Sequence, residues 1–92
     1  MTTARTAAPD VSIVVPIYNE VESLPDLVER IALAMAGQAL SFELLAVDDG
    51  SKDGSADRLR ELAATRPWLR PVFLARSYGQ SSALQAGFDR VR

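Results

Sequence analysis

The chain has 92 residues, of which 48% are hydrophobic, and its formal net charge is −2. That length predicts one small domain, and the mild charge with scattered arginines gives no electrostatic reason to expect a nucleic-acid partner. The sequence contains no cysteine and no histidine, so disulfides, thiolate metal sites and the commonest general base are excluded, and any metal would need the oxygen ligands that suit Mg²⁺ or Mn²⁺.

Residues 1–10 are small and polar. They lack the apolar core of a signal peptide, so we expect a disordered leader. No apolar run approaches the ~20 residues needed to cross a bilayer, which predicts a cytoplasmic location. The folded domain is expected to occupy residues 11–92.

Residues 11–17 are apolar at successive positions, which predicts a parallel strand covered on both faces. Residues 23–26 have a capping-box pattern with proline in the first turn of a helix. Apolar residues at helical spacing continue to Met35, and Gly37 is expected to end that helix.

Residues 41–47 form the second predicted strand, and Asp53 is expected to cap a helix that ends before Pro67. Residues 71–75 form the third predicted strand. A third helix is expected to follow it, capped by Ser81 or Ser82 and with three apolar residues on its buried face: Leu84, Phe88 and Val91.

The order β-α-β-α-β-α predicts an α/β fold with a Rossmann-like, parallel, three-stranded sheet. Right-handed crossovers give the strand order 3-2-1, with the first two helices on one face. A fourth strand usually pairs with the first, but the sequence stops at Arg92, so strand 11–17 would be an uncovered apolar edge. We therefore expect an incomplete domain that needs a missing C-terminal half or self-association.

Two adjacent carboxylates, Asp48 and Asp49, follow the second strand and precede a Gly-Ser turn. Side chains at the carboxyl end of a parallel strand reach the crevice where ligands bind in open α/β sheets. The pair could serve a nucleotide base, a ribose or a metal. It could also be turn chemistry that caps the next helix, and the residues alone leave both interpretations open.

Two other binding motifs fail on particular positions. A calcium-binding loop that starts at Asp49 has Arg60 at its twelfth position, where a bidentate glutamate is required. A Rossmann dinucleotide site would suit an acid after the second strand. It also requires a glycine-rich turn after the first strand, and residues 16–23 contain no glycine.

Polar and aromatic residues also follow the other two predicted strands. Tyr18 could stack on a base and Glu20 adds a third carboxylate, just after Pro16 interrupts the strand ladder. Arg76 could bind phosphate oxygens in a bidentate manner. The alternatives are an ordinary surface turn after the first strand and a structural ion pair between Arg76 and Asp48 or Asp49.

Three segments together resemble the family 2 glycosyltransferases, which have the GT-A fold: residues 14–20, residues 43–55, and residues 76–80 with Ala83 and Gly87. The third segment is most similar to the branch that transfers sugars to polyprenyl phosphate, although that branch often has asparagine where this chain has Ser77. The resemblance implies that residues 11–92 are the N-terminal, nucleotide-binding half of a GT-A fold.

The resemblance also implies roles for individual residues. Tyr18 with Pro16 would pack against the base of a UDP- or GDP-sugar, and Glu20 would lie beside the nucleoside. Asp49 would contact the base and Asp48 would buttress the loop. In a separate role, Arg76 would sit near the diphosphate.

In such a family the sugar passes to an acceptor such as polyprenyl phosphate or a glycan, with inversion at the anomeric carbon. The family's Asp-x-Asp motif, which holds Mg²⁺ or Mn²⁺, and its catalytic base come after the third helix and are absent from this chain. We therefore expect no catalytic residue, no complete metal site and no activity from the chain alone. Full-length relatives often act at the cytoplasmic face of the membrane. The alternative is a non-catalytic nucleotide-binding or interaction module.

Overall fold

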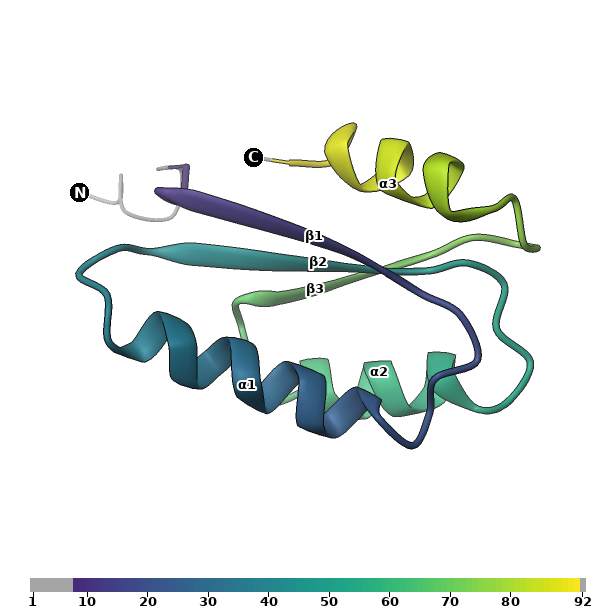
Figure 1. Cartoon of the computed structure of the whole chain (residues 1–92), viewed down its shortest axis with the longest axis horizontal. Helices are drawn as coiled ribbons and strands as arrows, with labels where there is room; N and C mark the ends of the chain where they lie inside the picture. Colours follow the sequence, from purple (N-terminus) through teal and green to yellow (C-terminus); the bar gives the residue numbers. More distant parts are fainter. Residues whose placement is uncertain (1–7, 92) are drawn as a thin grey trace.

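The computed structural model describes residues 8–91, apart from the side chain of Ser81. It contains one parallel sheet of three strands and three helices (Figure 1). The elements in chain order are β1 (Val11–Ile17), α1 (Leu24–Ala36), β2 (Phe42–Asp48), α2 (Ser55–Ala63), β3 (Leu69–Phe73) and α3 (Gln80–Phe88). The predicted α/β class is confirmed.

The central strand is β2, which pairs in parallel with β1 on one side and β3 on the other. These are the same neighbours that the order 3-2-1 contains. The pairing of β1 with β2 runs from Val11 opposite Phe42 to Ile17 opposite Asp48. Both strands therefore end at the same level, which brings the residues after them together.

The third strand begins two residues earlier than predicted, at Leu69 rather than residue 71. Pro71, the first residue of the predicted strand, lies inside β3, opposite Ala46 of β2. Within the described residues β3 is an edge strand, and an edge position tolerates the missing N–H of proline because that position need not donate to a neighbour. The strand also ends two residues earlier than predicted, at Phe73 rather than residue 75, so the loop into α3 starts at Leu74.

The helices cover the sheet as predicted, with α1 and α2 on one face and α3 on the other (Figure 1). Side chains along β2 alternate between these layers. Leu44 and Ala46 belong to the buried cluster that β1, β2 and β3 form with α1 and α2. In contrast, Val47 lies against Gly87 of α3.

The buried face of α3 differs from the prediction. Ala83 is fully buried and Gly87 is buried, whereas Phe88 is 60% exposed. A Cβ atom on Gly87 would lie 2.3 Å from Cγ1 of Val14, so the helix packs closer to the sheet than any larger residue allows. The spacing of large apolar residues selected the wrong face because small residues make this contact.

Ser23 lies at the N-cap position of α1 as predicted but lacks the capping bond, and the cap predicted for the third helix is wrong. The Ser23 side chain makes no cap bond. Instead its hydroxyl donates to the carbonyl of Glu20 at 3.4 Å, and that carbonyl also accepts the N–H of Leu24. The third helix starts at Gln80 after Gly79, so neither predicted serine occupies the N-cap.

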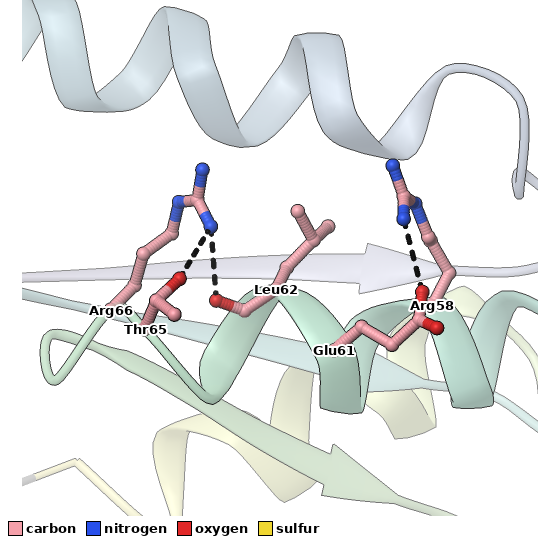
Figure 2. A network of polar contacts seen from close by, with 5 residues as sticks. All are labelled: Arg58, Glu61, Leu62, Thr65 and Arg66. Carbon is pink, nitrogen blue, oxygen red and sulfur yellow. Dashed lines mark hydrogen bonds and ion pairs between the residues drawn. The ribbon is translucent and has the colours of Figure 1, made fainter.

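Side chains make polar contacts with the backbone at both ends of α2. Asp53 accepts the N–H of Ser55 at 3.0 Å, although the N-cap position itself is Gly54. At the other end Arg66 donates to the carbonyl of Leu62 and to the hydroxyl of Thr65, which satisfies one of the carbonyls that a helix C-terminus leaves open (Figure 2).

Near the start of the described chain, Asp10 and Ser41 exchange hydrogen bonds ahead of β1 and β2. The rest of the predicted leader, residues 1–7, lies outside the described residues. Among the helices of residues 8–91, none is long and apolar enough to cross a membrane.

Candidate functional site

The carboxyl ends of the three strands lie side by side. The N–H of Asp49 donates to the carbonyl of Ile17 at 2.8 Å, and the N–H of Leu74 donates to the carbonyl of Asp48 at 2.9 Å. Backbone pairing thus extends slightly beyond the strands. It fixes the start of the three following loops relative to one another, as expected for a ligand site at the edge of an open α/β sheet.

Two adjoining pockets open at this edge, and they share Tyr18 and Ser77. The first pocket, of about 350 Å³, is lined by Pro16, Tyr18, Glu20, Asp49, Ser77, Gly79 and Gln80. The second pocket, of about 370 Å³, is lined by Tyr18, Asp48, Gly50, Ser51, Lys52, Ala56, Arg60, Phe73, Leu74, Ala75, Arg76 and Ser77. Four of the predicted site residues therefore meet in the first pocket, while Asp48 and Arg76 line the second.

Asp48 and Asp49 serve different pockets because adjacent residues of an extended chain point to opposite faces of a sheet. Asp48 lies on the side of α2, with Ala56 and Arg60, and Asp49 lies on the side where Gly79 leads into α3. The two acids therefore do not act as one carboxylate pair.

Asp49 is only 4% exposed, and it holds the loop that leads into α3. Its carboxylate accepts the Ser77 hydroxyl at 3.1 Å and the backbone N–H groups of Tyr78 and Gly79 at 2.8 and 3.0 Å. The buttress role predicted for Asp48 is thus performed by Asp49 in this structure. A carboxylate offers about four acceptor positions, so one remains, on Oδ1.

Asp48 is 3% exposed, and within the described residues its Oδ1 atom has no hydrogen-bond partner. Buried polar atoms are nearly always paired. Three of the residues that line the second pocket carry a positive charge: Lys52, Arg60 and Arg76. Asp48 is therefore an acidic residue with an open acceptor in a basic pocket.

Aromatic rings support two of these arginines. The guanidinium of Arg60 lies 4.2 Å from the centre of the Phe73 ring, and that of Arg76 lies 5.1 Å from the centre of the Tyr78 ring. Sequence reasoning missed Arg60 as a pocket residue. Its spacing was the available signal, because Arg60 follows Ala56 by one helical turn and both must face the same way.

Gly50 allows the loops after β2 and β3 to touch. Its φ of +71° is the left-handed conformation that favours glycine. A Cβ atom there would lie 2.4 Å from the backbone nitrogen of Ser77 and 2.5 Å from the carbonyl carbon of Arg76. The glycine after the two acids is therefore required by close backbone packing.

The residues described do not form a metal site. Across residues 8–91, no group of three or more Asp, Glu, His or Cys side chains is arranged to hold a metal ion. Most of the acceptor positions of Asp49 are already occupied by the chain itself. We therefore derive no chemical step through a metal from these residues.

Comparison with known proteins places this chain among sugar transferases. The model of the family described as "Glycosyl transferase family 2" matches residues 12–92. Two curated relatives are undecaprenyl-phosphate 4-deoxy-4-formamido-L-arabinose transferases. The one from Edwardsiella ictaluri is 48% identical over 84 residues, which cover 89% of this chain and 26% of the relative. The one from Pseudomonas fluorescens is 47% identical over 83 residues, which cover 89% of this chain and 24% of the relative.

A solved structure has the same fold. The mannosyltransferase from Pyrobaculum calidifontis, in complex with GDP-Man and Mn²⁺, superposes with a TM-score of 0.78 at 27% identity, covering 95% of this chain and 26% of that one. The chain spans about a quarter of the length of the curated relatives it matches. Because the family model matches nearly the whole sequence, the chain belongs to glycosyl transferase family 2.

Proposed function

We propose that residues 11–92 are the nucleoside-binding part of a glycosyltransferase that uses a UDP- or GDP-sugar and passes the sugar to polyprenyl phosphate. The observation that carries this proposal is the meeting of Pro16, Tyr18, Glu20 and Asp49 in one pocket at the carboxyl edge of the sheet. Each supplies a feature that a nucleoside needs: an apolar wall, an aromatic ring and two acceptors.

The first pocket suits a base that has a ring N–H group on its pairing edge. Tyr18 is 48% exposed, so its ring face is open for stacking, a contact that aromatic residues make with any base. The remaining acceptor position on Oδ1 of Asp49 suits a ring N–H, which uracil and guanine carry and which adenine and cytosine lack. Glu20 is exposed at the same pocket and could accept hydrogen bonds from ribose hydroxyls.

A nucleoside in the first pocket would have the second pocket beside it, across Tyr18 and Ser77. Arg76 lies there, stacked on Tyr78, rather than beside Glu20. We propose that Arg76 contacts the diphosphate from this second pocket. Asp48 would keep the second pocket polar behind Tyr18.

The acceptor and the metal come to this chain only through its relatives. The curated relatives are named as undecaprenyl-phosphate transferases, and the structural relative binds GDP-Man and Mn²⁺. We propose a polyprenyl phosphate acceptor, a divalent metal held by residues beyond those described, and a cytoplasmic site of action. We also propose that residues 11–92 are an incomplete nucleotide-sugar-binding domain without activity alone.

Titration of the chain with UDP, GDP, CDP and ADP tests the proposal, with backbone amide NMR shifts as the readout. We expect UDP or GDP to move the signals of Tyr18, Glu20 and Gly79, and CDP and ADP to move them less at the same concentration. Glu20→Gln should weaken the binding severalfold. Glu22→Gln is the matched control, since it changes an equally exposed acid that does not line the first pocket. Shifts confined to other surfaces, or equal effects of the two variants, would remove the nucleoside from this pocket.

A further inference from the structure

The loop after β1 (residues 18–23, here the first loop) is joined by side-chain hydrogen bonds to the segment after β2 (residues 50–55, here the second loop). The N–H of Asn19 donates to the hydroxyl of Ser51 at 2.9 Å, and the N–H of Lys52 donates to Oδ1 of Asn19 at 2.8 Å. Asn19 has a φ of +50°, which asparagine tolerates better than most residues. The reciprocal bonds hold this unusual backbone in place.

Two further residues of the second loop continue the contact. The N–H of Glu20 donates to the hydroxyl of Ser55 at 3.0 Å, and the N–H of Val21 donates to Oδ2 of Asp53 at 3.1 Å. Asp53 in turn accepts both the hydroxyl and the N–H of Ser55 on Oδ1, at 2.6 and 3.0 Å. Asp53 and Ser55 therefore form one connected group.

This group acts on consecutive backbone positions. Asn19, Glu20 and Val21 each donate their N–H to a side chain of the second loop, and all three acceptors come from residues 51–55. Ser55 is fully buried, so its hydroxyl cannot easily turn to water if the contact is lost. The first loop has little freedom while these bonds persist.

The held backbone carries side chains that line the first pocket. Tyr18 and Glu20 lie immediately before and within the bonded positions, whereas neither Asp53 nor Ser55 lines that pocket. Asp53 is also more than a turn component, because the hydrogen bond from Ser55 lowers the pKa of its carboxyl and so favours the charged acceptor.

We propose that Asp53 and Ser55 are positioning residues of the nucleotide site, which hold the backbone at Glu20 and Val21 so that Tyr18 and Glu20 face a bound nucleoside. This role rests on the proposed function. The sequence alone assigned only Asp48 and Asp49 of this polar region to the site. The positioning role adds Asp53 and Ser55, which lie farther along the chain. Pre-organised contacts raise affinity because the ordering cost is met before binding.

The test uses one serine substitution and one acid substitution, each with a matched control elsewhere in the chain. Ser55→Ala removes the acceptor of the Glu20 N–H. Its control is Ser12→Ala, which also removes a hydroxyl bond that bridges β1 and β2, but at the opposite end of those strands, where Ser12 donates to Glu43 at 2.6 Å. The second variant is Asp53→Asn, with Glu61→Gln as the control at an exposed acid of α2 (Figure 2).

The readouts are the Kd for UDP and GDP and the hydrogen exchange of the Glu20 and Val21 amides in the free 92-residue chain. Loss of one such bond should raise Kd about five- to tenfold in Ser55→Ala and Asp53→Asn and speed exchange at those two amides. The controls should change Kd less than about twofold. The double variant should be less than additive, because the two side chains bond each other.

Three results separate the possibilities. Faster amide exchange with an unchanged Kd in both variants would overturn the positioning role and leave the proposed function intact. Ser12→Ala weakening nucleotide binding as much as Ser55→Ala would also overturn it, since the effect would then follow general stability. A wild-type chain that binds neither UDP nor GDP would refute the proposed function itself, and the positioning role with it.

Discussion

Substituting Gly50 by alanine tests whether the loops after β2 and β3 are packed as tightly as the structure shows. The added Cβ would lie within 2.8 Å of three backbone atoms of Arg76 and Ser77. Backbone atoms cannot rotate away as the end of a flexible side chain can. The loop that Asp49 holds must therefore move, or Gly50 must leave its φ of +71°.

Two terms add up in this substitution. A non-glycine residue in the left-handed region costs about 1–2 kcal/mol, and forcing an extra carbon into a packed region typically costs about 1–3 kcal/mol. We expect a total near 3 kcal/mol, which should lower Tm by roughly 12–24 °C in a domain of this size. The whole domain is worth roughly 5–14 kcal/mol, so the loss would be large.

Alanine substitutions at two other glycines separate the backbone cost from the steric cost of the added carbon. Gly79 has a φ of +98° and a ψ of 160°, a backbone region that is essentially confined to glycine, and no described atom lies within 4 Å of its added Cβ, so Gly79→Ala reports a backbone cost alone, about 1–3 kcal/mol. Gly37 has a φ of −83° and no described neighbour within 4 Å. Its replacement by alanine should be neutral or stabilise by up to about 1 kcal/mol.

Urea unfolding of the three variants, followed by the fluorescence of Trp68 and by circular dichroism, gives the free energies of unfolding. We expect stability to fall in the order Gly37→Ala, Gly79→Ala, Gly50→Ala. If Gly50→Ala cost no more than the about 1–2 kcal/mol of the left-handed backbone alone, the close approach of Arg76 and Ser77 to Gly50 would be wrong. Close backbone packing would then not be the reason for a glycine at position 50.

Three more substitutions address the rest of the fold. Arg70→Met removes the ion pair between Arg70 and buried Glu43 and should cost about 1.5–3 kcal/mol in urea unfolding, and a loss below about 0.5 kcal/mol would show that the pair is structurally unimportant. Gly87→Ala should separate α3 from the sheet and cost about 1–3 kcal/mol, measured by Tm, and an unchanged Tm would contradict the close packing. The folded pKa of Asp53 is lowered, so its contribution to stability is present above the ordinary pKa and is lost as the pH falls below about 4. The stability difference between wild type and Asp53→Asn should therefore shrink as the pH is lowered through that range, and a constant difference would refute it.

Much of the fold could be predicted from the sequence because its strands are continuous apolar runs. β1 has the predicted bounds, and β2 is displaced by one residue. The errors arose where local signals conflict with tertiary packing. Pro71 lies inside an edge strand, and α3 packs through Ala83 and Gly87, whose small side chains carry almost no weight in a hydrophobic pattern.

Which residues gather at the candidate site could be predicted from the sequence, but how they divide between the two pockets could not. Strand ends at one edge of a parallel sheet had to bring Tyr18, Glu20 and Asp49 close together. The sequence could not reveal that Arg76 turns toward Tyr78 and the second pocket, because the direction of a loop side chain depends on contacts formed only in the fold. Arg60 was missed because it lies in the second turn of α2, whereas the predicted site residues all lie at or just after the ends of strands.

The two adjacent acids show how a period of two residues can determine function. Asp48 and Asp49 leave the same strand end in opposite directions, so one faces α2 and the other faces the loop into α3. Inserting a single residue between them would turn the second acid to the same face as Asp48, because every second residue of an extended chain points the same way. Asp49 would lose three donors, and its remaining acceptor position would be displaced from the first pocket. The spacing of the pair, rather than its charge alone, thus connects the loop before α3 to the site, and a shift of either acid by one position should impair both.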